Sequence, residues 1–183
     1  MREKIRSRLT ERSGFTLAEL MISMLVMLMV TGIVASGIPL AKDAMDKVVD
    51  AANARILLST TATALRTELS VATNAAAAGD GKSVTYTSAE NGSKSKISTY
   101  APGDAVKSIK LEQYIDYSEA AKPDARQLVS DKAATKGLST KFDSITYDEP
   151  THCFVITNLK VMKEGQAAPL AQLESYQIRN IAP

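Results

Sequence analysis

The chain has 183 residues, of which 45% are hydrophobic and 23% charged, so it has room for one domain plus an appendage. Its net charge of +2 arises in the first 14 residues, which sum to +3 and leave the rest at −1, without the basic surface that nucleic-acid-binding domains show. A single cysteine, Cys153, excludes a disulfide within the chain, so any exported domain must fold on its core and hydrogen bonds alone.

The longest apolar stretch follows the basic N-terminal segment directly. Residues 15–40 contain one charged side chain, Glu19. About 20 apolar residues in a helix suffice to cross a bilayer core, so this stretch is long enough to span a membrane. The basic residues before it place the N-terminus in the cytoplasm and everything after Leu40 outside. A carboxylate in the bilayer core costs roughly 2.5–3.5 kcal/mol, so Glu19 needs a functional reason.

Two general interpretations of this stretch leave features unexplained. A cleaved secretory signal has an uncharged apolar region of about 7–15 residues, and this one is longer and contains Glu19, although residues 34–36 loosely fit a cleavage site. A plain signal anchor fits the length but does not account for Glu19 or for the Gly14–Phe15 boundary.

The junction SGFTLAEL, residues 13–20, resembles the prepilin-type signal of type IV pilins and pseudopilins. That signal has a glycine, an aromatic residue that becomes N-methylated, a glutamate four residues later and a long apolar helix. In this family a membrane-embedded aspartyl peptidase cuts after the glycine and methylates the new N-terminus. The resemblance implies cleavage between Gly14 and Phe15, methylation of Phe15 and an assembly role for Glu19. It implies three partners: the prepilin peptidase/methyltransferase, other pilin subunits bound through the N-terminal helix, and the cytoplasmic membrane before assembly.

The charge on Glu19 then acquires a physical role. Cleavage leaves a charged amine at the bilayer edge, and Glu19 of a neighbouring subunit can neutralise it as subunits stack. A buried charge is tolerated only when it is paired, so we expect an isolated subunit to leave Glu19 unpaired and assembly to be favoured.

Apolar residues continue at helical spacing beyond Leu40. They form two stripes, Met45, Val49, Ala52 and Ile56 followed by Leu58, Ala62, Leu65 and Leu69. We expect both to pack on the chain's own head domain. A continuous helix from Phe15 to about Leu69 would be about 80 Å long.

Three residues weaken this helix, namely Gly32, Gly37 and Pro39. Proline removes one backbone hydrogen bond and clashes with the preceding turn, so we expect a kink or local melting near residues 35–39.

The rest of the chain predicts short strands. Residues 73–81 are expected to be a loop because of their glycines, and Asn91-Gly92 predicts a tight hairpin turn. Residues 118–138 are polar and predict a surface loop, with a short strand at 127–129. Apolar alternation predicts further strands at 83–88, 96–100, 105–117 (one or two), 142–147, 153–162 and 170–181. Free cysteines are usually buried, so Cys153 is expected to be a small buried hydrophobe in its strand, and the alternative is a thiol that pairs between chains.

Consecutive hairpins imply an antiparallel sheet with one face free to pack on the helix. The predicted fold is therefore α+β, with a long N-terminal helix packed on an antiparallel β-sheet head, which is also the pilin-like fold that the resemblance implies. Its expected segments are a leader peptide at 1–14, a transmembrane and assembly helix at 15–40, an amphipathic continuation at 41–72 and the head domain at 73–183.

Catalytic and metal-binding patterns are missing from the sequence. His152 is the only histidine, and Cys153 beside it in a strand would point to the opposite face. Asp143, Asp148 and Glu149 could form a weak cation site, but a solvated turn is the simpler interpretation. We therefore expect no enzyme activity, no cofactor and no bound metal, and the sequence has no clear nucleic-acid site.

The sequence thus predicts a structural pilin-like subunit, held in the cytoplasmic membrane by a single pass before assembly and in a filament or the cell envelope afterwards. The disulfide-closed loop of many major pilins is impossible here, which favours a minor subunit, a pseudopilin or a filament of bacteria that do not rely on disulfides. One alternative is a pseudopilin of a type II secretion or DNA-uptake (competence) machine. An alternative of another class is a membrane-anchored extracellular binding protein without an assembly role.

Overall fold

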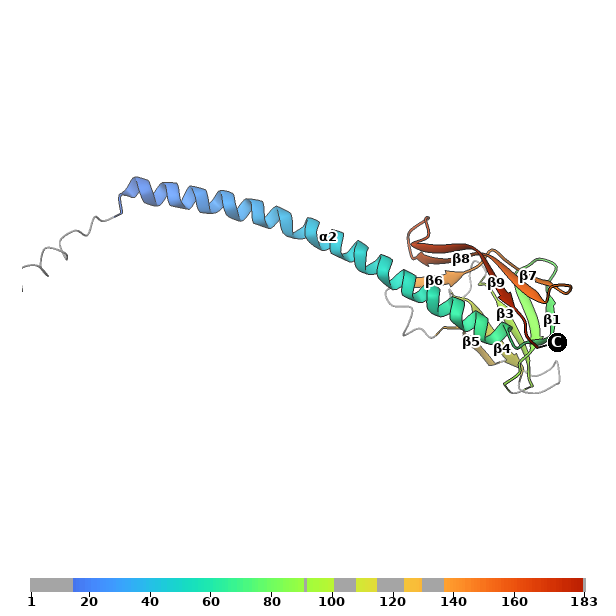
Figure 1. Ribbon diagram of the computed structural model, residues 1–183. Helices are drawn as coiled ribbons and strands as arrows, with labels where there is room; N and C mark the ends of the chain where they lie inside the picture. Colours follow the sequence, from blue (N-terminus) through green and yellow to red (C-terminus); the bar gives the residue numbers. More distant parts are fainter. Residues whose placement is uncertain (1–14, 91, 101–107, 115–123, 130–136, 183) are drawn as a thin grey trace, which may run out of the picture. The chain divides into compact units, whose positions relative to one another are not determined.

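The computed structural model describes residues 15–90, 92–100, 108–114, 124–129 and 137–182 (Figure 1). The chain divides into two compact units, residues 1–47 and 48–183. The first contains the N-terminal part of a long helix, and the second contains the rest of that helix together with the described strands. This arrangement confirms the predicted α+β architecture of a long N-terminal helix and an antiparallel β head.

Helix α2 spans Leu17–Leu69, within two residues of the predicted helix at each end. It is unbroken at residues 35–39, although Pro39 lies inside it, so the local melting predicted there is wrong. A proline removes only one hydrogen bond of the ladder, and the flanking turns keep theirs. A kink at Gly32, Gly37 or Pro39 remains a prediction.

The first sheet contains five of the described strands in the order β1-β2-β3-β4-β5, and neighbouring strands are antiparallel. The strands are β1 (Thr73–Ala77), β2 (Ser83–Thr87), β3 (Lys94–Ser98), β4 (Lys110–Tyr114) and β5 (Asp124–Gln127). The β2–β3 hairpin is confirmed, with Gly92 at φ 66°, while Asn91 lies outside the described residues. Of the predicted strand 105–117, residues 110–114 form β4, and β5 begins three residues before the predicted strand at 127–129.

The predicted loop at residues 73–81 is wrong in its first part, because residues 73–77 form strand β1. The register of β1 against β2 shifts between Thr73 and Ala76, and Asn74 between them has φ 50°. Its alanines show no alternation that a sequence pattern could detect. The strand is instead defined by backbone pairing with β2, and β-propensity depends strongly on such context.

The second sheet is built on the long strand β8. Strands β6 and β7 pair one after the other along one edge of β8, and β9 pairs along the other edge. These strands are β6 (Leu138–Lys141), β7 (Ser144–Asp148), β8 (Cys153–Lys163) and β9 (Ala171–Arg179). The single predicted sheet is therefore wrong, because the described strands form two sheets. Apolar alternation in the sequence locates strands but does not say which of them pair. Strand β6, which begins at the end of the polar segment 118–138, was not predicted.

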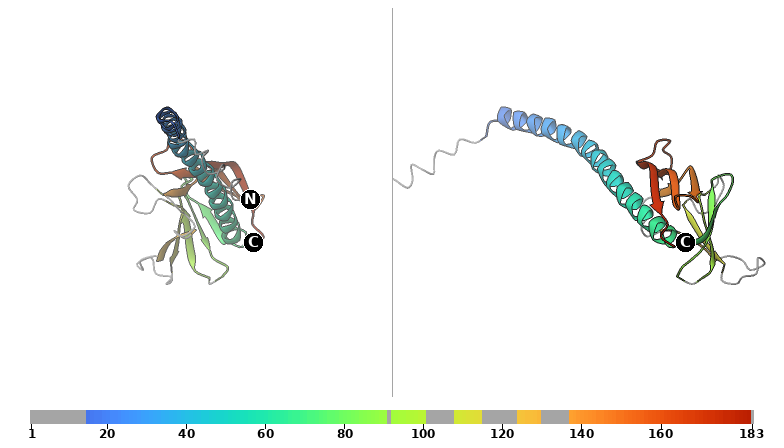
Figure 2. Two further views of the ribbon diagram at one scale, coloured as in Figure 1. Left: turned by 90° about the vertical axis from the view of Figure 1, so that its left-hand side faces the viewer. Right: turned by 45° about the vertical axis from the view of Figure 1, so that its right-hand side comes forward.

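The core lies in the second unit, where the C-terminal part of α2 lies alongside the strands (Figure 2). Leu58, Ala62, Leu65 and Leu69 are buried, as predicted. The other predicted stripe is wrong, because Met45 and Ile56 are 68% and 63% exposed. The periodicity contains two apolar faces, and only contact with the sheets decides which of them is buried. The largest fully buried strand side chains include Tyr86, Phe154, Ile145 and Ile156.

Hydrogen bonds from β9 and the residue after it hold the C-terminal part of α2 and the residues that follow it against the head. The Tyr176 hydroxyl donates to the Ala62 carbonyl at 3.2 Å, and the Asn180 amide side chain donates to the Ala72 carbonyl at 2.7 Å. From the other sheet, the Tyr86 hydroxyl donates to the Glu68 carboxylate at 3.0 Å. Burial raises the pKa of Tyr86, and the negative charge of Glu68 raises it further, so the tyrosine stays a donor.

Asp143 lies between β6 and β7 and links this segment to β8. Its carboxylate lies 2.8 Å from the Lys160 ammonium and accepts a hydrogen bond from the Asn158 side chain at 3.0 Å. The hydrogen bond from Lys160 is the main cause of a lowered pKa at Asp143. A lowered pKa means that the folded state holds the carboxylate in its ionised form more strongly than the unfolded chain does.

The contribution of Asp143 to stability should therefore be complete above its unfolded pKa of about 3.9 and disappear as pH falls through its lower folded pKa. Between pH 6 and pH 3, we expect the melting temperature of Asp143→Asn to fall by less than that of the wild type. The measurement is thermal unfolding of the full chain in detergent, followed by circular dichroism. Asp46→Asn, which changes an exposed helix carboxylate, should show the wild-type loss. An equal loss in Asp143→Asn and wild type would contradict the prediction.

Candidate functional site: the start of helix α2

The first turn of α2 is closed by two residues that hydrogen-bond reciprocally. The Thr16 amide donates to the Glu19 carboxylate at 3.0 Å, and the Glu19 amide donates to the Thr16 hydroxyl oxygen at 3.3 Å. The Thr16 hydroxyl also donates to the same Glu19 oxygen at 3.0 Å. This is a capping box, which satisfies amides that the start of a helix otherwise leaves without partners.

The capping box gives the Glu19 carboxylate hydrogen-bond donors within its own turn, while the expectation that an isolated subunit leaves its charge unpaired stays a prediction. It does not neutralise the charge, since residues 15–41 contain no Lys or Arg. Glu19 is thus held in one place, and no cation of the described residues pairs with it. Thr16 is a site residue that the sequence analysis missed. The T-x-x-E spacing of Thr16 and Glu19 is the signal that could have revealed it.

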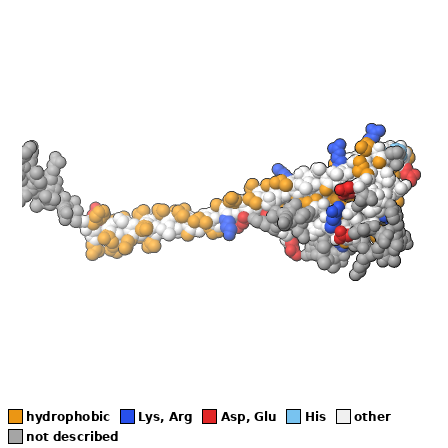
Figure 3. Space-filling view, turned by 90° about the horizontal axis from the view of Figure 1, so that it is seen from below, with side chains coloured by type: hydrophobic (Ala, Val, Ile, Leu, Met, Phe, Trp, Pro, Cys, Tyr) orange, Lys and Arg blue, Asp and Glu red, His pale blue; other side chains and the backbone are white. Residues whose placement is uncertain are grey.

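The helix surface that follows Glu19 carries no charged side chain from Leu20 to Ala41. The side chains of residues 15–48 are exposed, and Figure 3 shows hydrophobic side chains covering the N-terminal part of the helix. α2 is long and apolar enough to cross a membrane, with a mean hydropathy of 2.3 in its most apolar window. Soluble proteins rarely leave so large an apolar surface in water, so lipid or other protein must cover it. The helix is consistent with membrane anchoring.

The other residues predicted for this segment are placed less specifically. Gly14 lies outside the described residues, and Phe15, which follows it, is 79% exposed. A β-carbon added at Gly32 or Gly37 would meet no atom within 4 Å, so no contact in the described part of this chain requires glycine there.

The remaining polar candidates lie just before β7 and around the turn between β7 and β8. His152 is exposed, with its Nδ1 atom 3.2 Å from the Tyr147 hydroxyl, and Cys153 is only partly buried, contrary to the expectation of full burial. Asp143 is paired with Lys160, whereas Asp148 accepts a hydrogen bond from Thr151. Among the described residues, no group of three His, Cys, Asp or Glu side chains is placed to hold a metal ion.

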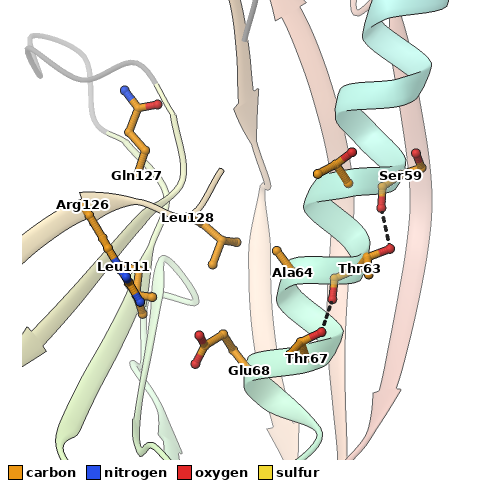
Figure 4. A pocket seen from close by; sticks show the side chains of 10 residues that line it. Ser59, Thr63, Ala64, Thr67, Glu68, Leu111, Arg126, Gln127 and Leu128 are labelled. Carbon is orange, nitrogen blue, oxygen red and sulfur yellow. Dashed lines mark hydrogen bonds between the residues drawn. The ribbon is translucent and has the colours of Figure 1, made fainter. Parts of the chain in front are cut away.

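A groove of about 880 Å³ lies between α2 and the segment around β5 (Figure 4). Its helical wall carries hydroxyl groups, but their protons are donated to helix carbonyls, as from Thr63 to Ser59 at 2.9 Å and from Thr67 to Thr63 at 3.0 Å. Glu68 in the same wall is bonded to Tyr86. The groove therefore presents no activated nucleophile paired with a base among its described lining residues.

The start of α2 is thus the part of the molecule with a distinctive arrangement. A family model for the prokaryotic N-terminal methylation motif matches residues 10–35. The chain carries a type IV prepilin-type signal. The match includes Phe15, Thr16 and Glu19 and confirms the resemblance drawn from SGFTLAEL. Comparisons with curated proteins and with solved structures gave no significant match. The prepilin-type signal characterises structural subunits rather than enzymes, and it supports a pilin-like substrate of prepilin peptidase.

Proposed function

We propose that this protein is a structural pilin-like subunit of a type IV filament. It is made as a membrane-held precursor, cut after Gly14 by prepilin peptidase and assembled through its N-terminal helix. The observation that carries the proposal is the exposed apolar surface of α2, which begins beside a prepilin-type signal and a Glu19 carboxylate that a capping box holds in place.

The length of this surface supports assembly rather than anchoring alone. About 20 helical residues cross the hydrocarbon core, which is about 30 Å thick. Exposed apolar side chains nevertheless continue past Leu40 to Met45, Val48 and Ile56. From Leu17 to Ile56 a helix rises about 60 Å, about twice what a membrane anchor needs. Neighbouring helices would cover the additional apolar side chains, and this favours a filament subunit over an anchored binding protein.

Glu19 supports the same proposal through its charge. Cleavage after Gly14 would create a charged amine on Phe15, four residues before Glu19. With no cation of its own in residues 15–41, Glu19 can be neutralised by the amine of an adjacent subunit. The capping box with Thr16 keeps the carboxylate in a defined position for that contact.

A pseudopilin of a type II secretion or DNA-uptake machine is the second candidate. It would use the same signal and helix, and the single cysteine favours it over a disulfide-closed major pilin. Neighbouring genes for an outer-membrane secretion channel, or for DNA-uptake proteins, would distinguish this machine from a pilus.

The test of the proposed processing is the N-terminus of the mature protein. We expect mass spectrometry to show a chain that begins at Phe15 and carries one additional methyl group. Gly14→Val should block cleavage because the peptidase acts next to this residue, and it should leave the precursor intact. A mature chain that begins at Met1, or near Gly37 as after secretory cleavage, would overturn the proposal.

A further inference from the structure

Asp50 is the first residue along α2 whose side chain is buried. The described side chains before it are exposed, except that of Val49, which is partly buried. Asp50 is only 7% exposed, and it is the one charged residue among the buried side chains of the described ranges. A carboxylate is rarely buried unless it is paired, so the position of Asp50 requires a partner.

That partner is Lys163, the last residue of β8. Its ammonium group forms a salt bridge and hydrogen bond with the Asp50 carboxylate. The Asp50 side chain is 10% exposed and that of Lys163 32%, so the pair is partly shielded from water. The contact joins residues 113 positions apart and therefore ties the helix to the second sheet.

The path of β8 explains why a lysine reaches this position. Buried side chains occur at Phe154 and Ile156 and then at Leu159 and Val161, so the alternation shifts by one residue at Asn158. Asn158 has a left-handed backbone, with φ 52°. After this shift Lys163, rather than Met162, is in phase with the buried side chains, because strand residues two apart share a face.

We propose that the Asp50–Lys163 ion pair is a clamp that holds the part of α2 around residues 50–57 against the second sheet, within the second unit. Ala54 and Leu57, which follow Asp50 along the helix, are buried. The described helix side chains that precede Val49 are all exposed. That neighbouring subunits contact the exposed helix segment before Val49 rests on the proposed function. The clamp itself does not rest on it.

Loss of Asp50 or Lys163 should loosen the packing of α2 on the second sheet near residues 50–57. Removing Lys163 leaves a carboxylate that is buried without a cation, which is strongly destabilising. The helix can relieve this by moving Asp50 into water, and Ala54 and Leu57 would then separate from the sheet. The contacts around Leu65 and Leu69 lie two to three turns further along and should remain.

Hydrogen–deuterium exchange of the full chain in detergent micelles tests the clamp without requiring assembly. We expect Lys163→Met and Asp50→Asn to increase amide exchange at residues 50–57 by about tenfold or more, with exchange in β2 and β3 unchanged. The reversed pair, Asp50→Lys with Lys163→Asp, should restore much of the protection. Lys47→Met and Asp46→Asn, which alter exposed charges on the same helix, should have no effect.

Two results would overturn the clamp. One is wild-type protection at residues 50–57 in both single variants. The other is a reversed pair that exchanges as fast as the single variants, since an electrostatic contact should tolerate the exchange of its charges. If a single variant accelerates exchange across the whole head, recovery in the reversed pair supports the clamp and failure to recover overturns it. Failure of the proposed function would appear instead as an unprocessed or unassembled wild-type chain.

Discussion

Glu19→Gln should be processed normally and fail to enter filaments. Gln at this position keeps the capping box, because its side chain can still accept a hydrogen bond from the Thr16 amide, but it carries no charge. The variant therefore removes the attraction between Glu19 and the amine of an adjacent subunit while the helix start stays intact. Relief of an unpaired charge is worth roughly 2.5–3.5 kcal/mol on membrane insertion scales, or about sixtyfold or more per subunit.

The measurement is the fraction of processed subunits recovered in sheared filaments, compared with the fraction in the membrane. Thr16→Ala is the matched control, since it removes the Thr16 hydroxyl from the capping box and retains the charge of Glu19. It should weaken the helix start by about 1 kcal/mol and reduce assembly much less than Glu19→Gln does. Normal incorporation of Glu19→Gln would show that charge pairing does not drive assembly.

Leu65→Ala should mainly lower the stability of the head, whereas Ile56→Ala should mainly lower filament assembly. Leu65 is fully buried against the sheets, so its truncation should lower the free energy of unfolding of the head by about 2–5 kcal/mol. Ile56 lies on the same helix but is 63% exposed, so its truncation should change the stability of the monomer by less than about 0.5 kcal/mol. If neighbouring subunits cover this side chain, Ile56→Ala should reduce filament yield.

Both variants can be measured as full-length chains. Urea unfolding in detergent, followed by circular dichroism, gives the stability difference, and filament yield gives the assembly difference. Met45→Ala, at another exposed apolar position of the helix, is a second assembly variant that should leave the head stable. Equal destabilisation by Leu65→Ala and Ile56→Ala would contradict the assignment of the buried face.

Features that depend on local sequence were predictable. The prepilin-type signal is a short contiguous motif, and Phe15 and Glu19 could be read from their spacing to Gly14. Helix α2 ends at Leu69 as its periodicity indicates, and β8 and β9 lie within two residues of their predicted bounds because their apolar alternation is sustained. Even Thr16 was available from the sequence, through a four-residue capping pattern.

Features that depend on distant pairing were not predictable. Neighbouring side chains alone fix where the chain becomes apolar, where it turns helical and where its long strands run. Contacts between distant segments instead decide that Leu65 rather than Ile56 is buried, that residues 73–77 join a sheet and that the described strands form two sheets. They also bring together Asp50 and Lys163, whose pairing depends on the left-handed backbone of Asn158 and on the packing of a helix against a strand more than a hundred residues away.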